Sequence, residues 1–246
     1  RPMDAERCAQ TRKLIDSVDW PCQVHRRFQP TNLGCKLGVS SAIDWFFDCE
    51  PFGIILEDDT VPHPSFFPYA ETLLHRYQHD ERVGMISGNN FLFGERASPF
   101  SYYCSYIAHI WGWAGWRRAW LKNDVHLETL SEVDLRLDMT AMGVASERQA
   151  YWFRIFRALK AGVDTWDYQW LFSSWHARQW TLLPAVNLVS NIGFGNQSTK
   201  TRWHSVTANM KSITMSQPLH HPPVLEHATS ADHWVERHIF DGRLGK

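Results

Sequence analysis

The sequence lacks a long apolar run, a strong excess of charge of either sign and closely spaced cysteine pairs. No stretch reaches the roughly 18 apolar residues that a membrane-spanning helix needs, so we expect neither a transmembrane segment nor a signal peptide. The net charge of -1 and the pI near 7.0 argue against a general electrostatic affinity for nucleic acid or for an anionic membrane surface.

The cysteines are few and dispersed. Their odd number and the absence of CxxC spacing argue against a disulfide framework and against a zinc site. We expect small buried thiols in a reducing compartment, which favours a cytoplasmic location, with peripheral attachment at the inner membrane left open. The five are Cys8, Cys22, Cys35, Cys49 and Cys104.

Hydrophobic and aromatic side chains are abundant. The 246 residues, of which 44% are hydrophobic and 21% charged, predict one folded domain or one domain with an appendage. Thirteen tryptophans either fill an aromatic core or form flat platforms for ring-shaped ligands. The histidines show no metal-ligand spacing, and we expect scattered surface imidazoles; they include His25, His63, His75, His79, His109, His126, His220 and His221.

Helical and strand patterns alternate along the first half of the chain. The apolar run 53–56 does not alternate with polar residues, which is typical of a central strand covered on both faces. This order predicts an α/β sheet with covered faces. The expected helices are 4–17, 38–49, 65–77, 147–161 and one from the capping residue Thr165 to 178, and the expected strands are 23–28, 53–56, 83–87 and 101–107.

The second half is less regular. Residues 111–116 predict a loop of tryptophan and glycine that turns helical toward 122, and residues 183–201 are rich in turn formers. The tail beyond Pro218 is rich in His and Pro, and we expect it to wrap loosely around the domain.

Three consecutive carboxylates, Glu57-Asp58-Asp59, follow the apolar run 53–56. Like charges at this spacing repel one another and call for a positive partner. The ligand sites of open α/β sheets lie just outside the carboxyl ends of strands. Hard oxygen ligands suit Mg²⁺ or Mn²⁺, ions that also bind substrate phosphates. The alternative is an acidic turn that caps the next helix.

The segment Gly53-Ile-Ile-Leu-Glu-Asp-Asp-Thr-Val-Pro-His-Pro-Ser-Phe-Phe67 resembles the EDD segment of GT-A glycosyltransferases. The likeness is to N-acetylglucosaminyltransferases that act on N-glycans and to a set of bacterial glycosyltransferases. In that family the segment is a variant DxD motif. The resemblance implies that Asp59 binds the metal while Glu57 and Asp58 approach the ribose and base of the nucleotide.

Asn32-Leu-Gly34 is similar to the stretch that precedes the family's DxD motif, and the resemblance implies that Asn32 and Gly34 lie near the nucleotide. Asp44 is either a further nucleotide contact or a helix-surface acid.

Trp111-Gly-Trp-Ala-Gly-Trp116 resembles the family's glycine-and-aromatic loop, which lines the donor sugar and the acceptor. By this resemblance Trp113 contacts the donor, and Trp111 and Trp116 contact the acceptor.

Trp166-Asp-Tyr-Gln-Trp170 resembles the family's Trp-Asp element. In inverting members its Asp is the catalytic base, which implies that Asp167 is the base here. The alternative is that Asp167 only supports the N-terminus of its helix.

Residues 191–199 (NIGFGNQST) look like the family's C-terminal loop that closes over the diphosphate. Lys200 and Arg117 are candidate cations for the diphosphate, and His204 is a candidate further metal ligand. Arg117 and the neighbouring Arg118 are alternatively surface charges on a helix.

Taken together, the resemblance implies an α/β fold of the GT-A type, a mixed sheet flanked by helices, over residues 1–205, followed by a C-terminal tail at 206–246. The family fold begins with a strand and a helix that hold much of the nucleobase pocket. The chain opens at Arg1 without a start Met, so we expect this first βα unit to be missing.

The implied function is metal-dependent transfer of a hexosyl or N-acetylhexosaminyl group, in polysaccharide biosynthesis. The implied donor is a nucleotide sugar, a UDP-sugar foremost, and the implied acceptor is a hydroxyl of a glycan or lipid-linked glycan. Mn²⁺ or Mg²⁺ is the implied cofactor, and inversion follows if Asp167 is the base. A carbohydrate-binding or inactive transferase-like protein and a metal-dependent phosphoesterase remain alternatives, although the sequence offers no second acidic strand end for a two-metal site.

Overall fold

The computed structural model describes residues 4–194 and 206–240, and the chain forms two compact units, Arg1–Asn32 and Leu33–Lys246. In the first unit, helix α1 (Asp4–Leu14) continues into a 3₁₀ turn, Ile15–Ser17, which confirms the helix expected at 4–17. The strand expected at 23–28 is wrong, because this stretch has no regular secondary structure and pairs with no strand among the described residues.

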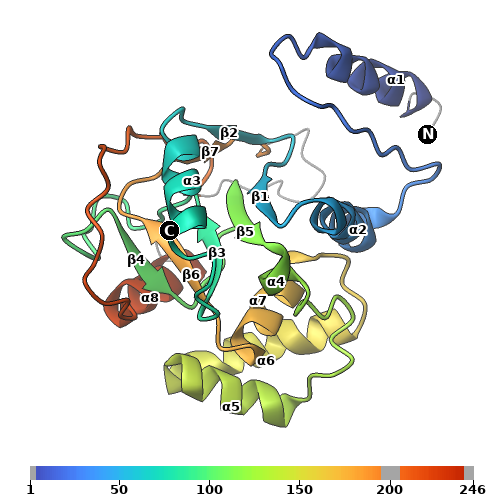
Figure 1. Cartoon of the computed structure of the whole chain (residues 1–246). Helices are drawn as coiled ribbons and strands as arrows, with labels where there is room; N and C mark the ends of the chain where they lie inside the picture. The colour runs from blue at the N-terminus through green and yellow to red at the C-terminus, as the bar shows by residue number, and fades with distance from the viewer. Residues whose placement is uncertain (1–3, 195–205, 241–246) are drawn as a thin grey trace. The chain divides into compact units, whose positions relative to one another are not determined.

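The second unit is built on a mixed five-stranded sheet in the order β1-β5-β3-β6-β4 (Figure 1). Strands β3 and β6 are parallel, and the other neighbouring pairs are antiparallel. A small second sheet pairs β2 with β7. The bounds are β1 (Phe52–Ile55), β2 (Thr60–Pro62), β3 (Val83–Ser87), β4 (Tyr102–Ser105), β5 (Trp113–Trp116), β6 (Trp180–Pro184) and β7 (Val189–Asn191).

Helices cover both faces of the larger sheet, which confirms the expected α/β class. Helix α3 (Phe66–Arg76) packs with Ala114, Trp116 and Leu182 on one face. The opposite face carries α2 (Gly34–Cys49), α4 (Arg117–Trp120) and α7 (Asp167–His176), whose buried residues surround Met85 and Trp113. Neighbouring residues of β5 thus enter different cores, as the two-residue period of a strand requires.

Two expectations about strands are corrected. Strand β1 forms where it was expected, but it is an edge strand, paired only with β5, and its residues are half-buried; a covered central position was therefore wrong. Residues 113–116 are a buried strand rather than a loop. Gly115 makes this possible, because a Cβ there would lie 2.9 Å from the ring of Trp113.

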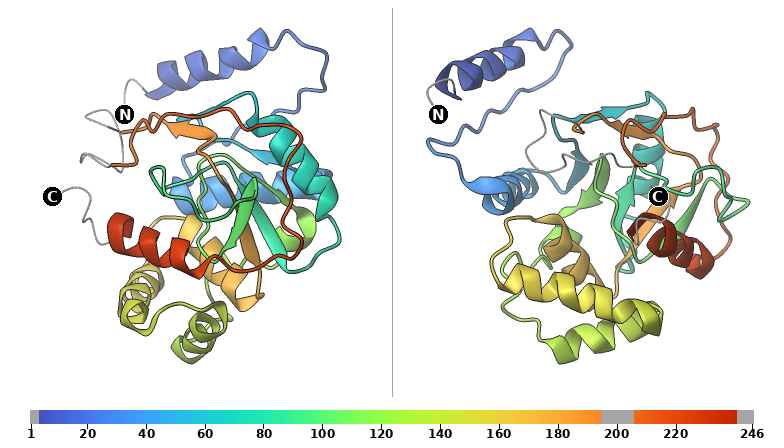
Figure 2. Two further views of the ribbon diagram at one scale, coloured as in Figure 1. Left: turned by 90° about the vertical axis from the view of Figure 1, so that its left-hand side faces the viewer. Right: turned by 180° about the vertical axis from the view of Figure 1, so that it is seen from behind.

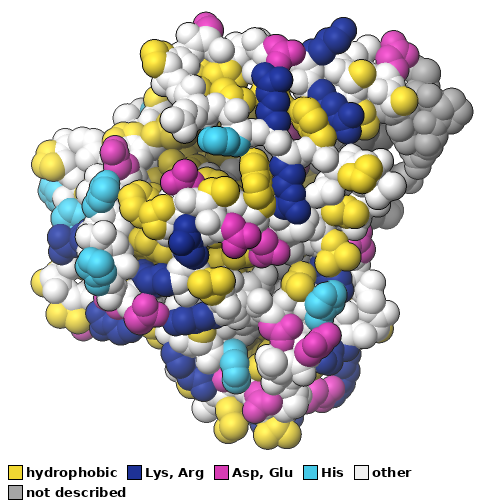
Figure 3. All heavy atoms as spheres, turned by 45° about the vertical axis from the view of Figure 1, so that its right-hand side comes forward, with side chains coloured by type: hydrophobic (Ala, Val, Ile, Leu, Met, Phe, Trp, Pro, Cys, Tyr) yellow, Lys and Arg dark blue, Asp and Glu magenta, His cyan; other side chains and the backbone are white. Residues whose placement is uncertain are grey.

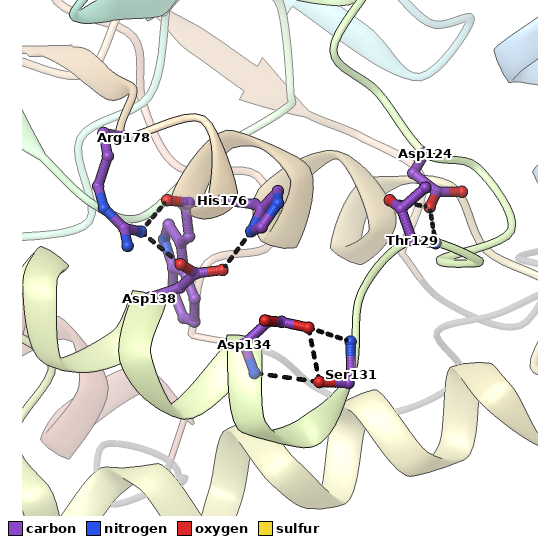
Figure 4. Close-up of polar contacts among 8 residues, drawn as sticks. Asp124, Thr129, Ser131, Asp134, Asp138, His176 and Arg178 are labelled. Carbon is purple, nitrogen blue, oxygen red and sulfur yellow. Dashed lines mark hydrogen bonds and ion pairs between the residues drawn. The ribbon is translucent and has the colours of Figure 1, made fainter.

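Helices α5 (Glu132–Met142) and α6 (Ser146–Lys160) pack beside α7 and enclose a separate aromatic core (Figure 2). Helix α5 begins with a capping box, in which Ser131 and Asp134 exchange side-chain-to-backbone hydrogen bonds (Figure 4). Thr165 does not cap α7 as expected; the N-cap residue is Trp166, and the Thr165 hydroxyl instead donates to the Asp167 carboxylate.

The C-terminal segment is part of the core, so the expectation of a loosely wrapped tail was wrong. Met215 and Leu219 are buried beside α3. Helix α8 (Thr229–Val235) is followed by a π-helical turn, Glu236–Phe240. The buried carboxylate of Asp232 accepts from the Ser105 hydroxyl at 2.5 Å and from the Tyr106 backbone at 2.9 Å, which anchors α8 to the end of β4.

The surface carries charges of both signs, consistent with the net charge of -1. Basic and acidic side chains both occur across the face shown in Figure 3. Within the described residues, no helix is long and apolar enough to cross a membrane. The five cysteines are free thiols, but only Cys104 is buried; Cys8, Cys22 and Cys49 are exposed, so the expectation of buried thiols holds for one position.

Candidate functional site

The three acids lie between the two sheets, in the turn that joins β1 to β2. The Thr60 hydroxyl donates to the Glu57 carbonyl at 2.8 Å and accepts from the Glu57 amide. Asp58 is exposed, whereas Glu57 and Asp59 are half-buried. Burial raises the pKa of Asp59 above its usual range and the charge of Asp58 adds to the rise, while a hydrogen bond from Asn191 opposes it. The ionised form of Asp59 is therefore disfavoured by its surroundings.

The first residues of the expected closing loop lie directly against Asp59. Strand β2 pairs with β7 so that Thr60 is opposite Asn191 (Figure 1), and the Ile192 amide donates to the Asp59 carbonyl at 2.8 Å. A Cβ atom on Gly193 would overlap the Asp59 carboxylate. The structure therefore brings together two motifs that lie more than a hundred residues apart in the sequence.

The Trp-Gly segment adjoins the same loop. The ring of Trp111 meets Phe194 edge-on, with centroids 5.5 Å apart. Gly112 has a φ of +70°, and a Cβ there would lie 2.9 Å from Val189 and 3.2 Å from Leu56. Glycine is therefore required at this position both for its conformation and for its close approach to β7 and to the residue before Glu57.

A cavity of about 140 Å³ connects Trp111 with Asp167. Asp167 is half-buried at the N-terminus of α7. Aromatic side chains dominate the wall, which is lined by Phe91, Ile107, Ala108, His109, Ile110, Trp111, Trp152, Asp167, Tyr168, Leu171 and Phe240. The structure thus places the expected base and one expected acceptor residue in one cavity.

The other two tryptophans of the segment are core residues. Trp113 is 1% exposed and lies in a cluster with Trp120, Trp166 and Trp170. Trp116 is 3% exposed, and its indole Nε1 donates to the Leu74 carbonyl at 3.2 Å. Because neither ring presents a face to solvent or to the cavity, the expected donor contact of Trp113 and acceptor contact of Trp116 do not fit this structure.

Arg117 and Gly34 have structural partners of their own. The Arg117 guanidinium donates to the carbonyls of Phe47 and Asp48 at the end of α2. Gly34 begins α2 with a φ of +74°, and the next two backbone amides donate to the Asp164 carboxylate, each at 2.8 Å. An acid of this chain therefore already occupies the helix N-terminus expected near the nucleotide.

The remaining expected residues are less informative. The Asp44 carboxylate accepts from the Trp120 indole at 2.7 Å, so it acts as a packing partner. Asn32 is the last residue of the first unit, whereas the acidic turn belongs to the second. Lys200 and His204 lie outside the described residues. Within the described ranges, no group of three or more His, Cys, Asp and Glu side chains has a metal-binding arrangement.

Of the eleven residues that line the cavity, sequence reasoning proposed a role for Trp111 and Asp167 only. His109 was expected at the surface, but it is 5% exposed, and its Nε2 has no hydrogen-bond partner among the described residues. Its flanking residues, Ile107-Ala108 and Ile110-Trp111, are apolar, a pattern that could have indicated burial. Phe240 was missed because the π-helical turn that carries it was expected to be a loose tail.

A further polar cluster lies away from this region. The Asp138 carboxylate on α5 accepts from His176 at 2.9 Å and from Arg178 at 2.5 Å (Figure 4). Asp138 is 2% exposed, whereas the side chains of His176 and Arg178 are about half exposed. The cluster ties α5 to the end of α7, and its partners satisfy the buried carboxylate, which is the pattern of a structural contact.

Comparison with models of known protein families and with curated protein sequences found no match.

Proposed function

We propose that the chain is a metal-dependent glycosyltransferase, which transfers a sugar from a nucleotide diphosphate to an acceptor hydroxyl. The observation that carries the proposal is the meeting of Asp59 with residues 191–193 and, through Phe194 and Trp111, with the cavity that contains Asp167. Residues from four of the motifs that resemble the GT-A family are thereby linked by successive contacts within the second unit.

The residues present fit a hard divalent cation. Asp59 offers a half-buried carboxylate whose pKa is raised chiefly by burial, and bound positive charge would relieve the cost of burying its ionised form. Mg²⁺ and Mn²⁺ sites of this kind need only one or two protein carboxylates, because water and substrate phosphates complete the shell. When bound, the ion would neutralise charge that develops on the leaving diphosphate.

The chain's own groups would perform the rest of the reaction. Asp167, at the first position of α7, would accept the proton of the acceptor hydroxyl as the anomeric bond breaks. The Thr165 hydroxyl, which donates to the Asp167 carboxylate, would hold that carboxylate in place. Trp111 would present its half-buried ring to the acceptor from the same cavity.

Binding of UDP with Mn²⁺, measured by titration calorimetry, tests this function. We expect binding in the presence of Mn²⁺, loss of binding with EDTA, and at least tenfold weaker binding in Asp59→Asn. The exposed acid Glu71 on α3 supplies a matched control, since Glu71→Gln removes the same charge elsewhere and should bind normally. Equal UDP affinity with and without EDTA would remove the main support for the proposal.

A carbohydrate-binding or inactive transferase-like protein is the second candidate. It is favoured by Asp164, whose carboxylate accepts from the Cys35 and Lys36 amides at the start of α2, where an anionic donor group would otherwise be bound. Sugar binding that persists with no nucleotide affinity under any metal condition would support this candidate instead.

A further inference from the structure

The residue that follows β3 connects two segments of the candidate site. Strand β3 ends at Ser87, and the backbone of Gly88 donates to the Gly112 carbonyl at 2.8 Å and accepts from the Leu188 amide at 2.8 Å. A Cβ atom on Gly88 would lie 2.9 Å from the Gly112 carbonyl oxygen, so glycine is what lets the segments approach this closely. The chain after β3 therefore holds the Trp-Gly segment and the start of β7 together.

The side chain of Asn89 makes the same connection. Asn89 is fully buried; its Oδ1 accepts from the Trp111 amide at 3.0 Å, and its Nδ2 donates to the Val189 carbonyl at 3.2 Å. The Asn89 amide donates to the Ser87 hydroxyl at 3.0 Å, which ties the residue to the end of β3. Because a carboxamide is planar and both of its ends are bonded, it fixes the separation between the Trp111 backbone and β7.

Both bonded segments lead directly to groups that the proposed function uses. Trp111 lines the cavity that contains Asp167. Val189 begins β7, whose pairing with β2 brings the segment 191–193 against Asp59. Groups that contact a substrate keep their place when supporting hydrogen bonds lock them, and a misplacement of about 1 Å can lower a rate about 10²-fold. The alignment of the acidic turn with the cavity therefore depends on this carboxamide.

Asn90, the next residue, supplies a matched comparison. It is 5% exposed, its Nδ2 donates to the Pro184 carbonyl at 2.7 Å, and its Oδ1 accepts from the Leu92 amide at 2.9 Å. Its carboxamide thus also makes two buried hydrogen bonds, but they go to the end of β6 and to its own loop. The two asparagines agree in residue type and burial and differ in what their side chains hold.

We propose that Asn89 is a positioning residue, whose carboxamide sets the place of Trp111 relative to β7 and hence to the acidic turn. The proposal rests on the proposed function only for its consequence in turnover. The positioning itself needs neither metal nor nucleotide nor sugar, so the two proposals fail independently.

Fluorine NMR of the whole chain labelled with 5-fluorotryptophan reports the surroundings of Trp111 directly. Its resonance among the thirteen tryptophans is identified with Trp111→Phe, and all spectra are recorded in EDTA without nucleotide. We expect Asn89→Ala to shift or split this resonance and Asn90→Ala to leave it in place, although both variants should melt at a lower temperature. A resonance that stays in place in Asn89→Ala, or moves equally in both variants, would show that Asn89 only stabilises the fold and would overturn the proposal.

Asn89→Asp tests the same role with a side chain of native size. A protonated carboxyl group offers an acceptor oxygen to the Trp111 amide and a hydroxyl donor to the Val189 carbonyl, as the native carboxamide does. Burial raises the pKa of such a group, so the Trp111 resonance should lie near its native position at about pH 5 and move away as the pH rises and the donor is lost. The native chain over the same pH range is the control. A resonance displaced at low pH as far as in Asn89→Ala would contradict the proposal.

The consequence for turnover is a split between kcat and KM. With a UDP-sugar, Mn²⁺ and a glycan acceptor, Asn89→Ala should lower kcat about 10- to 100-fold and leave the KM for the UDP-sugar within about twofold, whereas Asn90→Ala should leave both within about twofold. Equal kcat values in the two variants would overturn the role of Asn89 in transfer. Absence of turnover in the native chain would count against the proposed function alone, and the fluorine spectra would still decide the role of Asn89.

Discussion

Gly193 lies so close to Asp59 that a Cβ atom at position 193 would overlap the Asp59 carboxylate. The contact exists because β2 and β7 pair with Thr60 opposite Asn191, which brings the start of the 191–194 segment over the acidic turn. The absence of a side chain at Gly193 thus determines where the Asp59 carboxylate can lie.

Gly193→Ala should displace that carboxylate. We expect UDP–Mn²⁺ affinity to fall at least tenfold and the free energy of unfolding to fall by about 1–3 kcal/mol, as for other overpacked sites. Calorimetric titration and urea unfolding measure the two effects. The control is Gly38→Ala in α2, where the nearest atom to an added Cβ is 3.9 Å away and where alanine favours the helix. Unchanged UDP affinity in Gly193→Ala would contradict the inferred role of this contact.

The raised pKa of Asp59 has a consequence for stability. Because the folded-state pKa lies above the usual 3.8, the folded chain binds this proton more tightly than the unfolded chain, so this group makes stability fall as pH rises between the two values. Above both values the ionised carboxylate disfavours folding. Asp59→Asn should therefore melt at an equal or higher temperature than the native chain at pH 7 in EDTA, and the difference should disappear below pH 4. A lower melting temperature at pH 7 would contradict this assignment.

Asp167→Asn should separate chemistry from donor binding. If Asp167 is the base, turnover with a glycan acceptor should fall by about 10²–10⁴-fold, whereas UDP–Mn²⁺ affinity should stay within about twofold. Single-turnover assays and calorimetry provide the two numbers. An exposed acid on α5, Glu132, lies outside the cavity, and Glu132→Gln should leave turnover unchanged. Equal turnover in Asp167→Asn would leave this residue with only a helix-terminal role.

Substitution of Trp113 should lower the free energy of unfolding more than substitution of Trp111, although both residues belong to one motif. Trp113→Ala empties the centre of the Trp120, Trp166 and Trp170 cluster, and we expect a loss of about 3–5 kcal/mol in the free energy of unfolding. Trp111 is half-buried, so Trp111→Ala should cost less stability while weakening the binding of glycosides in the cavity. Equal losses of stability would show that Trp111 is also a core residue.

Substitution of Asp138 should lower the stability of the fold without changing UDP–Mn²⁺ affinity. Asp138→Ala leaves His176 and Arg178 without their shared buried acceptor, and we expect the free energy of unfolding to fall by about 1.5–3 kcal/mol, the range for hydrogen bonds to charged groups. Guanidinium unfolding measures it. UDP–Mn²⁺ affinity at a temperature where the variant is folded should be unchanged, and a specific loss of affinity would show that this cluster reaches the site.

Local signals in the sequence were sufficient for much of the secondary structure. The helices near 38–49, 65–77 and 147–161 and the strands at β1, β3 and β4 formed close to where hydrophobic pattern and turn residues predicted them, because these patterns act within a few residues of each other. Four short strands, β2, β5, β6 and β7, were missed. Each is defined by its pairing partner rather than by its own residues.

What the sequence by itself determined is the α/β class and the position of the acids at the end of a strand. Only the tertiary structure decided that β1 is an edge strand, that Trp113 and Trp116 belong to the core, and that the C-terminal segment supplies Phe240 to the cavity. Burial depends on which surfaces of the folded chain meet. Contacts such as that of Asp59 with Gly193 join residues that are far apart in the sequence, so the residues next to each of them do not indicate the contact.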